Sequence, residues 1–307
     1  MFNLILRRTL VAIPTLLILI VVTFLLMHSA PGGPFTSEKP LPPEVLARVE
    51  AKYGLDQTLP LQMWNYVVGI VTEFDFGPSF RYKDRTVNEI FAQGLPITLT
   101  YGTLSFVLSV VVGVFLGVWA AIRQNTWIDY LTVAFSMLAQ VLPNFVMGPI
   151  LILIFTLWLG WLPGGGWNGG QWQYIVLPVI ALSTSFMASI ARLMRSSMLE
   201  VLQSNFIRTA RAKGMPESTV ILRHALKPAM LPVITYLGPV FVYMITGSFI
   251  IDAIFSTGGL GYYFINAAFN RDYAVMMGVT LLLGGLTIFF NLVVDLIYGW
   301  VDPQIRY

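Results

Sequence analysis

Long apolar runs, each of about 20 residues or more, dominate this sequence and decide what it can fold into. A helix needs about that length of apolar chain to cross the hydrocarbon core of a bilayer. The third run is long enough either to tilt or to contain a break. The sequence therefore predicts an all-α polytopic membrane protein with six transmembrane helices, near residues 9–27, 97–122, 130–160, 174–194, 229–251 and 275–299.

The composition supports this class and excludes several kinds of function. Of the 307 residues, 56% are hydrophobic and 11% are charged, whereas a soluble domain carries about 25% charged residues. Cysteine is absent, which excludes disulfides, thiol catalysis and cysteine-bound metal centres. The only histidines, His28 and His224, fall on opposite sides of the bilayer in the predicted topology. We therefore expect neither a catalytic nor a metal site in this chain.

Lysine and arginine set the expected orientation. Apart from the long segment 28–95, they gather in the connections that share a side with the N-terminus, which predicts that both termini are cytoplasmic. The first apolar run is longer than the core of a typical signal peptide, so we interpret it as a retained span. The chain then divides into a first span at 1–27, a periplasmic cap at 28–95 and a core of five spans at 96–307.

The cap carries signals of local structure. Pro43 stands at the first position of a predicted helix, and Gly54 is expected to end it. The stretch "LQMWNYVVGIVTEF" predicts a second short helix, and "DFGPSFRYKDRTV" predicts a turn-rich return to the membrane. We interpret this segment as a small external structure and not as a second catalytic domain.

Three other patterns favour ordinary structural explanations. The glycine-rich run at 163–172 is followed by no lysine, so it predicts a tight turn and not a phosphate-binding loop. Gly113 and Gly117 form a GxxxG step, which favours close packing between helices. The position of Asp295, near the inner end of the last span, favours an interfacial carboxylate paired to a basic inner loop over a proton relay.

The most charged stretch of the chain, at 205–228, reads "NFIRTARAKGMPESTVILRHALKP". Ser204 can cap a helix that runs from about Asn205 to Lys213, and Gly214 stands where a left-handed end is expected. Pro216 and Glu217 then suit the first turn of a second helix. The pattern predicts an elbow of two short helices, at 204–228, between two spans.

The second helix of this elbow carries Val220, Ile221 and Leu222, and we expect them to form an exposed apolar face. One interpretation is a basic loop that only sets topology. The other is a docking surface for a second protein, which an exposed apolar face favours.

The elbow resembles the cytoplasmic signature loop of ABC importer membrane subunits, in the version found in peptide permeases. Arg208-Thr209-Ala210 stands where general importers have Glu-Ala-Ala, and Gly214 falls on the glycine of that loop. The resemblance extends over nearly the whole chain. The chain is similar to the oligopeptide permease subunit that carries a large outer loop. Its motifs include "RRTLVAIPTLLILI", "FDFGPSFRYKDRTV", "WLPGGGWNGG", "SNFIRTARAKG", "TGSFIIDAIF" and "VDPQIRY".

This resemblance implies a type I ABC importer permease fold in a bacterial inner membrane. It also implies a homologous second permease subunit, two cytoplasmic ATPase subunits that bind ATP and Mg, and a periplasmic peptide-binding protein; no nucleic acid is expected. The cytoplasmic coupling loop spans 195–228. The residues implied to engage an ATPase are Arg208, Thr209, Ala210, Gly214, Met215, Pro216, Glu217, Val220, Ile221 and Leu222.

The implied substrate is an oligopeptide. Dipeptides, cell-wall peptides or a nickel complex on the same fold remain open, and a secondary transporter is a remoter alternative. Weakly polar side chains near proline-interrupted spans are candidates to line the path, because broken helices at membrane depth are tolerated around a cavity. Interhelical hydrogen bonds are the alternative. These candidates are Ser136, Gln140, Asn144, Ser183, Ser185 and Tyr236.

Overall fold

The computed structural model describes residues 2–29, 35, 42–246 and 248–301. In this part of the chain every regular element is helical, and Pro78 and Thr86 form an isolated antiparallel bridge. The predicted all-α class is confirmed. The end of the motif "VDPQIRY", residues 302–307, lies outside the described residues.

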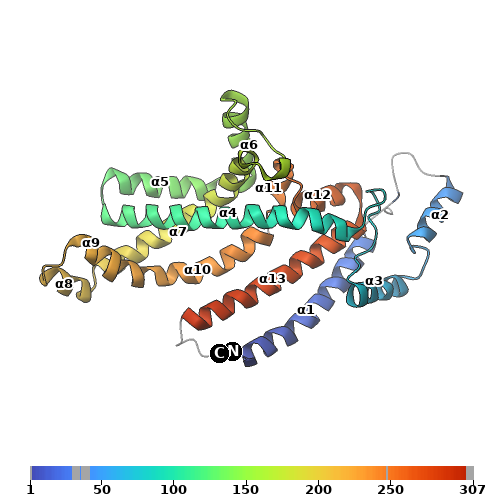
Figure 1. The fold of residues 1–307 in the computed structure, drawn as a ribbon, viewed down its shortest axis with the longest axis horizontal. Helices are drawn as coiled ribbons and strands as arrows, with labels where there is room; N and C mark the ends of the chain where they lie inside the picture. Colours follow the sequence, from blue (N-terminus) through green and yellow to red (C-terminus); the bar gives the residue numbers. More distant parts are fainter. Residues whose placement is uncertain (1, 30–34, 36–41, 247, 302–307) are drawn as a thin grey trace. The chain divides into compact units, whose positions relative to one another are not determined.

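The helices follow one another along the chain as Figure 1 labels them. In order they are α1 (Phe2–Ser29), α2 (Pro43–Lys52), α3 (Leu59–Glu73), α4 (Val87–Ile122), α5 (Trp127–Val141), α6 (Asn144–Leu151), the π-helix η1 (Ile152–Trp158), the 3₁₀ turn η2 (Asn168–Gly170), α7 (Trp172–Leu202), α8 (Asn205–Ala212), α9 (Glu217–Thr219), the π-helix η3 (Val220–Ala225), α10 (Leu226–Thr246), α11 (Phe249–Ile254), α12 (Leu260–Asn270) and α13 (Tyr273–Val301).

The six predicted spans correspond to helices of the described chain. Five continuous helical stretches are long and apolar enough to cross a membrane, and α5 with α6–η1 makes a sixth if that bent pair is one span. The pair is bent by 105°. Pro143 explains the break, because a proline disfavours helical geometry in the residue before it, and Leu142 is extended at ψ 113°. Of the two options for the third span, the structure adopts the break.

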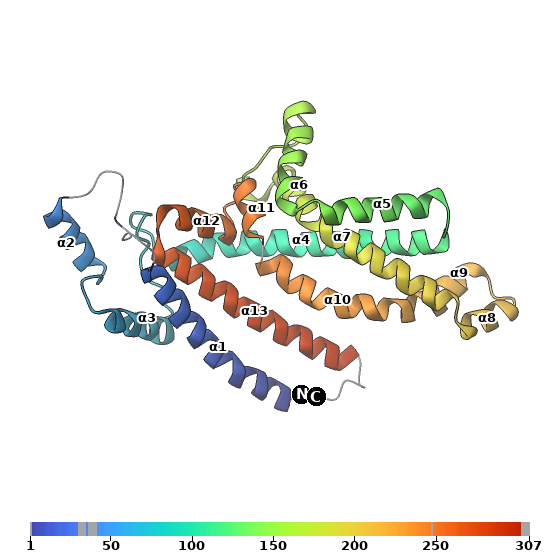
Figure 2. The same ribbon diagram turned by 180° about the vertical axis from the view of Figure 1, so that it is seen from behind.

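The first compact unit joins the two ends of the chain, Met1–Thr98 and Ser256–Tyr307. Within it α1 lies along α13, as Figure 2 shows. Gly284 permits this contact, since a Cβ there would lie 2.5 Å from Cδ2 of Leu19. Close to the N-terminal end of α1 and the C-terminal end of α13, Arg8 Nη2 lies 2.6 Å from Asp295 Oδ2. Asp295 therefore has a basic partner, but the predicted pairing to an inner loop is wrong, because the partner lies on α1.

The predicted cap structure is confirmed in this unit. Pro43 begins α2, and Gly54 follows its end at φ +67°. The turn-rich return is anchored by Asp272, which the sequence analysis did not single out. The buried Asp272 carboxylate accepts hydrogen bonds from the Ser79 hydroxyl and from the N–H groups of Phe80 and Arg81, and it caps α13 through Val275 N–H.

The second compact unit, Leu99–Phe255, is built around α7, which contacts α5, α6 and α10. The GxxxG step of α4 packs against it, as predicted. A Cβ on Gly113 would lie 2.9 Å from Met187 O, and one on Gly117 would lie 2.4 Å from Ala191 O. The glycine-rich run forms the predicted tight turn, in which Gly166 N–H donates to Phe255 O at 2.7 Å.

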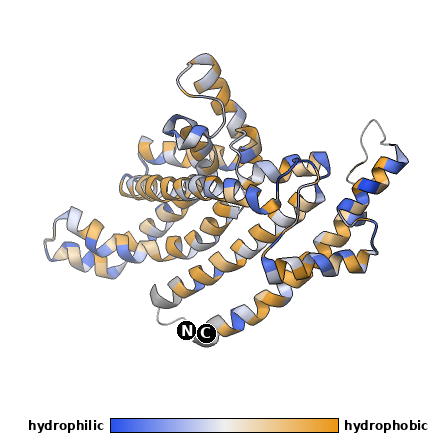
Figure 3. Ribbon diagram, turned by 45° about the vertical axis from the view of Figure 1, so that its right-hand side comes forward, coloured by the Kyte–Doolittle hydropathy of each residue, from blue (hydrophilic) through white to orange (hydrophobic). Residues whose placement is uncertain are grey.

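The long helices consist mostly of hydrophobic residues, as the colouring of Figure 3 shows. Large aliphatic side chains stand exposed on several helices, among them Leu10, Ile18, Val111 and Leu138. In water such surface would be unfavourable, so its natural surroundings are lipid chains.

Candidate functional site: the elbow and a polar face of α7

The elbow consists of α8 and a second arm that begins at α9, joined through Gly214. Gly214 has φ +75°, the left-handed conformation that the sequence predicts. Ser204 occupies the N-cap position of α8 with extended backbone geometry, but its side chain makes no capping bond. The Ser204 hydroxyl donates instead to Val201 O at 2.6 Å, so this residue ties α8 back to the end of α7. The predicted side-chain cap is wrong in this detail.

The inner face of the elbow is part of the core of the second unit. Ile207 and Ala210 of α8 and Val220 of the second arm are buried in one hydrophobic cluster with residues of α7 and α10. Ile221 packs against the same cluster. The prediction that Val220, Ile221 and Leu222 form an exposed apolar face is therefore wrong for Val220 and Ile221, because both side chains face the core. Leu222 alone among them is strongly exposed, at 66%.

The outer face of the elbow is polar with a few apolar side chains. Phe206, which the sequence analysis did not select, is 51% exposed. The structure places most of the predicted coupling residues on this face, whereas Ala210 is buried beside Ile207. The predicted residues that are exposed are Arg208, Thr209, Gly214, Met215, Pro216, Glu217 and Leu222.

A bidentate ion pair between Arg211 and Glu217 links the two arms of the elbow on either side of Gly214. Arg211 Nη2 lies 2.5 Å from Glu217 Oε1, and Nε lies 3.1 Å from Oε2. The pairing raises the pKa of the Arg211 guanidinium, whose charge is already permanent at neutral pH. Arg211 therefore does more than contribute one positive charge to the topology of the chain, because it links the two arms of the elbow. Sequence spacing does not identify this contact, since the turn between the arms brings the residues together.

The second arm continues into the membrane-spanning helix without a break. Helices α9, η3 and α10 follow one another directly from Glu217 to Thr246. Pro228 supplies no N–H, so regular α-helical bonding cannot be complete around it; the π-helical turn η3 lies immediately before that point. The elbow is therefore joined to α10 along the chain and packed against α7 through the buried cluster.

Three of the predicted path residues meet on one face of α7. Gln140 Nε2 donates to Ser189 Oγ at 2.9 Å, which in turn donates to Ser185 O at 3.0 Å. Tyr236 of α10 lines a cavity of about 490 Å³ together with Ser189 and Arg192. Ser189 and Arg192 were missed as path candidates; their spacing with Ser185 along one helical face is the signal that could have identified them.

The other three path candidates lie elsewhere. Ser183 is fully buried, and its hydroxyl donates to Ile180 O of its own helix at 3.0 Å, so this bond lies within α7 and does not join two helices. Ser136 is 1% exposed, and its hydroxyl has no hydrogen-bond partner among the described residues. Asn144 begins α6, just after the break at Pro143, and is half-buried.

A further basic residue of α7 is fully engaged. The Arg195 guanidinium binds the Asp129 carboxylate at two points, 2.5 Å and 2.7 Å, and Asp129 also accepts Asn125 N–H. Asp129 is buried in the first turn of α5. This ion pair fixes α5 on α7 and was not predicted.

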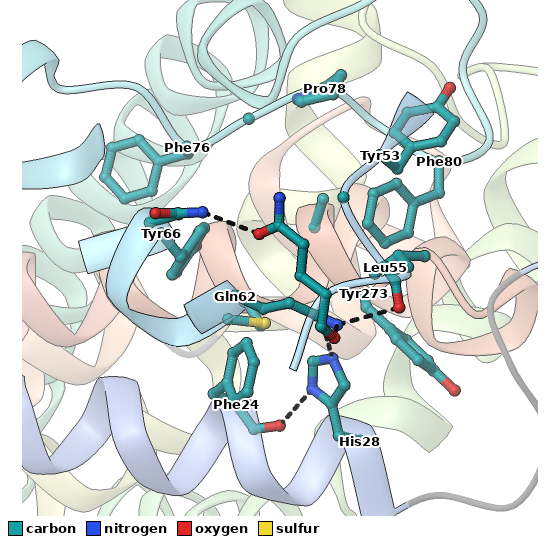
Figure 4. A pocket seen from close by; sticks show the side chains of 16 residues that line it. Phe24, His28, Tyr53, Leu55, Gln62, Tyr66, Phe76, Pro78, Phe80 and Tyr273 are labelled. Atoms are coloured by element: carbon teal, nitrogen blue, oxygen red, sulfur yellow. Dashed lines mark hydrogen bonds between the residues drawn. The ribbon is translucent and has the colours of Figure 1, made fainter. Parts of the chain in front are cut away.

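The segment 28–95, the predicted cap, contributes to a third candidate surface, shown in Figure 4. A pocket of about 240 Å³ is lined by aromatic rings and amide side chains. On its floor His28 lies between the Phe24 carbonyl and Gln62 Oε1, at 2.9 Å and 3.2 Å, while Gln62 Nε2 donates to Leu55 O. Burial, with the nearby Asp75 carboxylate, raises the pKa of the Tyr66 phenol. His28 thus joins the cap helix α3 to the end of α1.

No group of three or more His, Cys, Asp or Glu side chains that could hold a metal is found within the described residues. The elbow offers exposed polar groups on a tightly packed base, which suit contact with another protein. The face of α7 offers polar groups beside a cavity, which suit contact with a polar solute.

Comparison with known proteins covers the whole chain. Residues 113–307 match the family described as binding-protein-dependent transport system inner membrane component, and residues 1–102 match the N-terminal family of such membrane components. The chain is 52% identical to the oligopeptide transport system permease protein OppB of Haemophilus influenzae, with 100% of both chains covered. It is 40% identical to the dipeptide transport system permease protein DppB of Bacillus subtilis, covering 95% of this chain and 94% of that one.

Among solved structures, the fold is similar to that of a chain of the MetNI methionine ABC transporter in an inward-facing form. The TM-score is 0.59 at 19% identity, and the alignment covers 70% of this chain and 97% of the other. At this level of identity the likeness concerns the fold of the membrane core.

Proposed function

Because the chain belongs to the family of binding-protein-dependent transport system inner membrane components, we propose that it is the permease subunit of an ATP-driven importer that moves oligopeptides from periplasm to cytoplasm. Full-length identity of 52% to an oligopeptide permease, against 40% to a dipeptide permease, supports this substrate class. Dipeptides, cell-wall peptides and a nickel complex are the alternatives on the same fold. The chain is a transport subunit and not an enzyme.

The observation that carries the mechanism is the continuity of the elbow with the spans. Two cytoplasmic ATPase subunits bind ATP and Mg, and one of them receives the exposed elbow face, with Arg208, Met215 and Leu222 as contacts. When the ATPase subunits close, the buried cluster beneath α8 moves α7 and α10 with the elbow. A loosely tethered loop could not transmit this movement, whereas an elbow with a buried inner face can.

The remaining parts of the assembly follow from the same proposal. A homologous second permease subunit completes the path, of which this chain supplies Gln140, Ser185 and Tyr236. Both termini lie in the cytoplasm. A periplasmic peptide-binding protein lands on the cap, where the pocket beside His28 and the exposed residues of α2 offer a mixed polar and aromatic surface.

The proposal is tested by reconstituting the chain with its second permease subunit, ATPase subunits and binding protein in liposomes. Peptide-loaded binding protein should stimulate ATP hydrolysis, and labelled oligopeptide should accumulate inside only when ATP is supplied. Uptake driven by an ion gradient without ATP would support a secondary transporter instead. Uptake of dipeptides or of a nickel complex, with no oligopeptide uptake, would support the alternative substrates.

A further inference from the structure

One face of α7 is polar although the helix is a candidate membrane span. Ser185, Ser189, Arg192 and Ser196 follow one another at spacings of four, three and four residues, so they lie on the same side of the helix. Ser185 and Ser189 are half-buried, while Arg192 and Ser196 are exposed. The buried core face of the same helix carries different residues, which include Met194. The packing of the chain itself therefore uses this face only in part, through the hydrogen bond from Gln140 to Ser189.

The face opens on the cavity of about 490 Å³ described above, lined by Ser189, Arg192, Leu193, Ser196 and Tyr236. None of the described residues that line it is acidic. Asp129, the acidic residue paired to this part of α7, is bound at two points by Arg195. Within the described part of the chain Arg192 has no ion pair. A guanidinium and three hydroxyl groups thus surround a space with no anion.

A charged side chain on a membrane span is costly, and such residues usually face a water-filled path or a partner. Arginine presents N–H donors in a planar fork that matches the two oxygens of a carboxylate. We propose that Arg192 binds the C-terminal carboxylate of the transported peptide, an inference that rests on the proposed function. The hydroxyl groups of Ser196 and Tyr236 are placed to donate further hydrogen bonds to the same carboxylate.

The position along α7 places this site near the elbow end of the path. Leu202 ends the helix ten residues after Arg192, a distance of about 15 Å along the axis. Gln140 fixes the orientation of Ser189 one turn deeper, so the polar lining continues inward from the site. A lipid phosphate would require only the cation at the surface, whereas this arrangement of polar groups extends along the helix beside an open hollow with room for several atoms of a peptide.

The test uses the complete reconstituted transporter and one peptide in two forms, with a free C-terminal carboxylate and as the C-terminal amide. The readout is the ratio of the transport rates of acid and amide, compared between variants. The binding protein is the same throughout, so a change in this ratio reports on the permease. Arg192→Gln should lower acid transport about tenfold, the factor that loss of a charge-assisted hydrogen bond implies, and should leave amide transport unchanged. Arg192→Lys should retain part of the preference.

Arg123→Gln is the matched control, because it removes an exposed cation outside the cavity; its acid-to-amide ratio should equal that of the wild type. Equal losses for acid and amide in Arg192→Gln, as expected if Arg192 holds a lipid phosphate or the second subunit, would overturn the inference alone. Wild-type transport rates for both acid and amide in that variant would do the same. If the wild type transported neither form, the proposed function would fail and this inference with it.

Discussion

At residue 214 the backbone takes φ +75°, and an ideal Cβ built there has no heavy atom within 4 Å. Substitution of Gly214 therefore meets no steric obstacle from its surroundings, and its cost arises from backbone conformation alone. A left-handed conformation costs a residue with a Cβ roughly 1 kcal/mol or more, and a β-branched residue more than that. The elbow can relieve this strain by changing the angle between its two arms.

We therefore predict that Gly214→Val inserts and assembles normally but transports poorly. Because a strain of about 1 kcal/mol shifts an equilibrium roughly fivefold, peptide uptake should fall by about that factor or more. Membrane insertion, co-purification of the ATPase subunits and uptake are measured in parallel. Gly214→Asn should be close to wild type, since asparagine tolerates the left-handed region.

Gly160→Val is the matched control for this prediction. Gly160 also has positive φ, +64°, with no atom within 4 Å of an added Cβ, but it lies outside the elbow. The two valine variants carry comparable strain, so a selective loss of uptake in Gly214→Val would come from the elbow geometry. Full uptake with normal assembly in Gly214→Val would favour the interpretation that this stretch only sets topology.

Among whole helices, the contact of α4 with α7 depends on the absence of side chains at two positions. A Cβ on Gly117 would lie 2.4 Å from Ala191 O and 2.6 Å from Met194 Cβ. A backbone oxygen cannot move aside without moving its helix, so the two helices would have to separate. Overpacking of this kind costs about 1–3 kcal/mol.

We therefore predict that Gly117→Ala lowers the midpoint of thermal unfolding of the purified assembly in detergent. Gly285→Ala is the control, because Gly285 is also in a helix but an added Cβ meets nothing within 4 Å. Its midpoint should equal that of the wild type. If the two variants unfolded at the same temperature, the close approach of α4 and α7 would not be important for stability.

For the molecule as a whole, the cap and the elbow are proposed to serve different partners, and they should be separable by deletion. Helix α2 has no buried residue, so its removal exposes little of the chain's interior. The anchor at Asp272 holds the return segment near Ser79 and does not involve α2.

Deletion of residues 43–53 should leave insertion, assembly with the ATPase subunits and unstimulated ATP hydrolysis intact. Stimulation of hydrolysis by peptide-loaded binding protein should be lost, because α2 forms part of the proposed landing surface. The unstimulated rate of the same preparation is the internal control. If loaded binding protein still stimulated the deletion variant, its docking site would have to lie elsewhere on the chain.

Local features of this protein follow from the sequence because their causes are local. The length of the apolar runs predicts the spans, Pro43 and Gly54 predict the limits of α2, and Gly214 predicts the left-handed turn of the elbow. In each case the relevant physics is either transfer of contiguous apolar residues into lipid or the allowed backbone angles of one residue.

The tertiary structure alone decides which face of each helix is covered and by what. It turns Val220 into the core, leaves Arg192 beside a cavity with no ion pair to any described residue, and brings Arg8 to Asp295 from the opposite end of the sequence. Helical periodicity shows which residues share a face, but in a membrane protein the lipid-facing and the packed faces are both apolar. Only contacts between distant segments distinguish them, so the coupling surface and the polar face of α7 had to come from the packed helices.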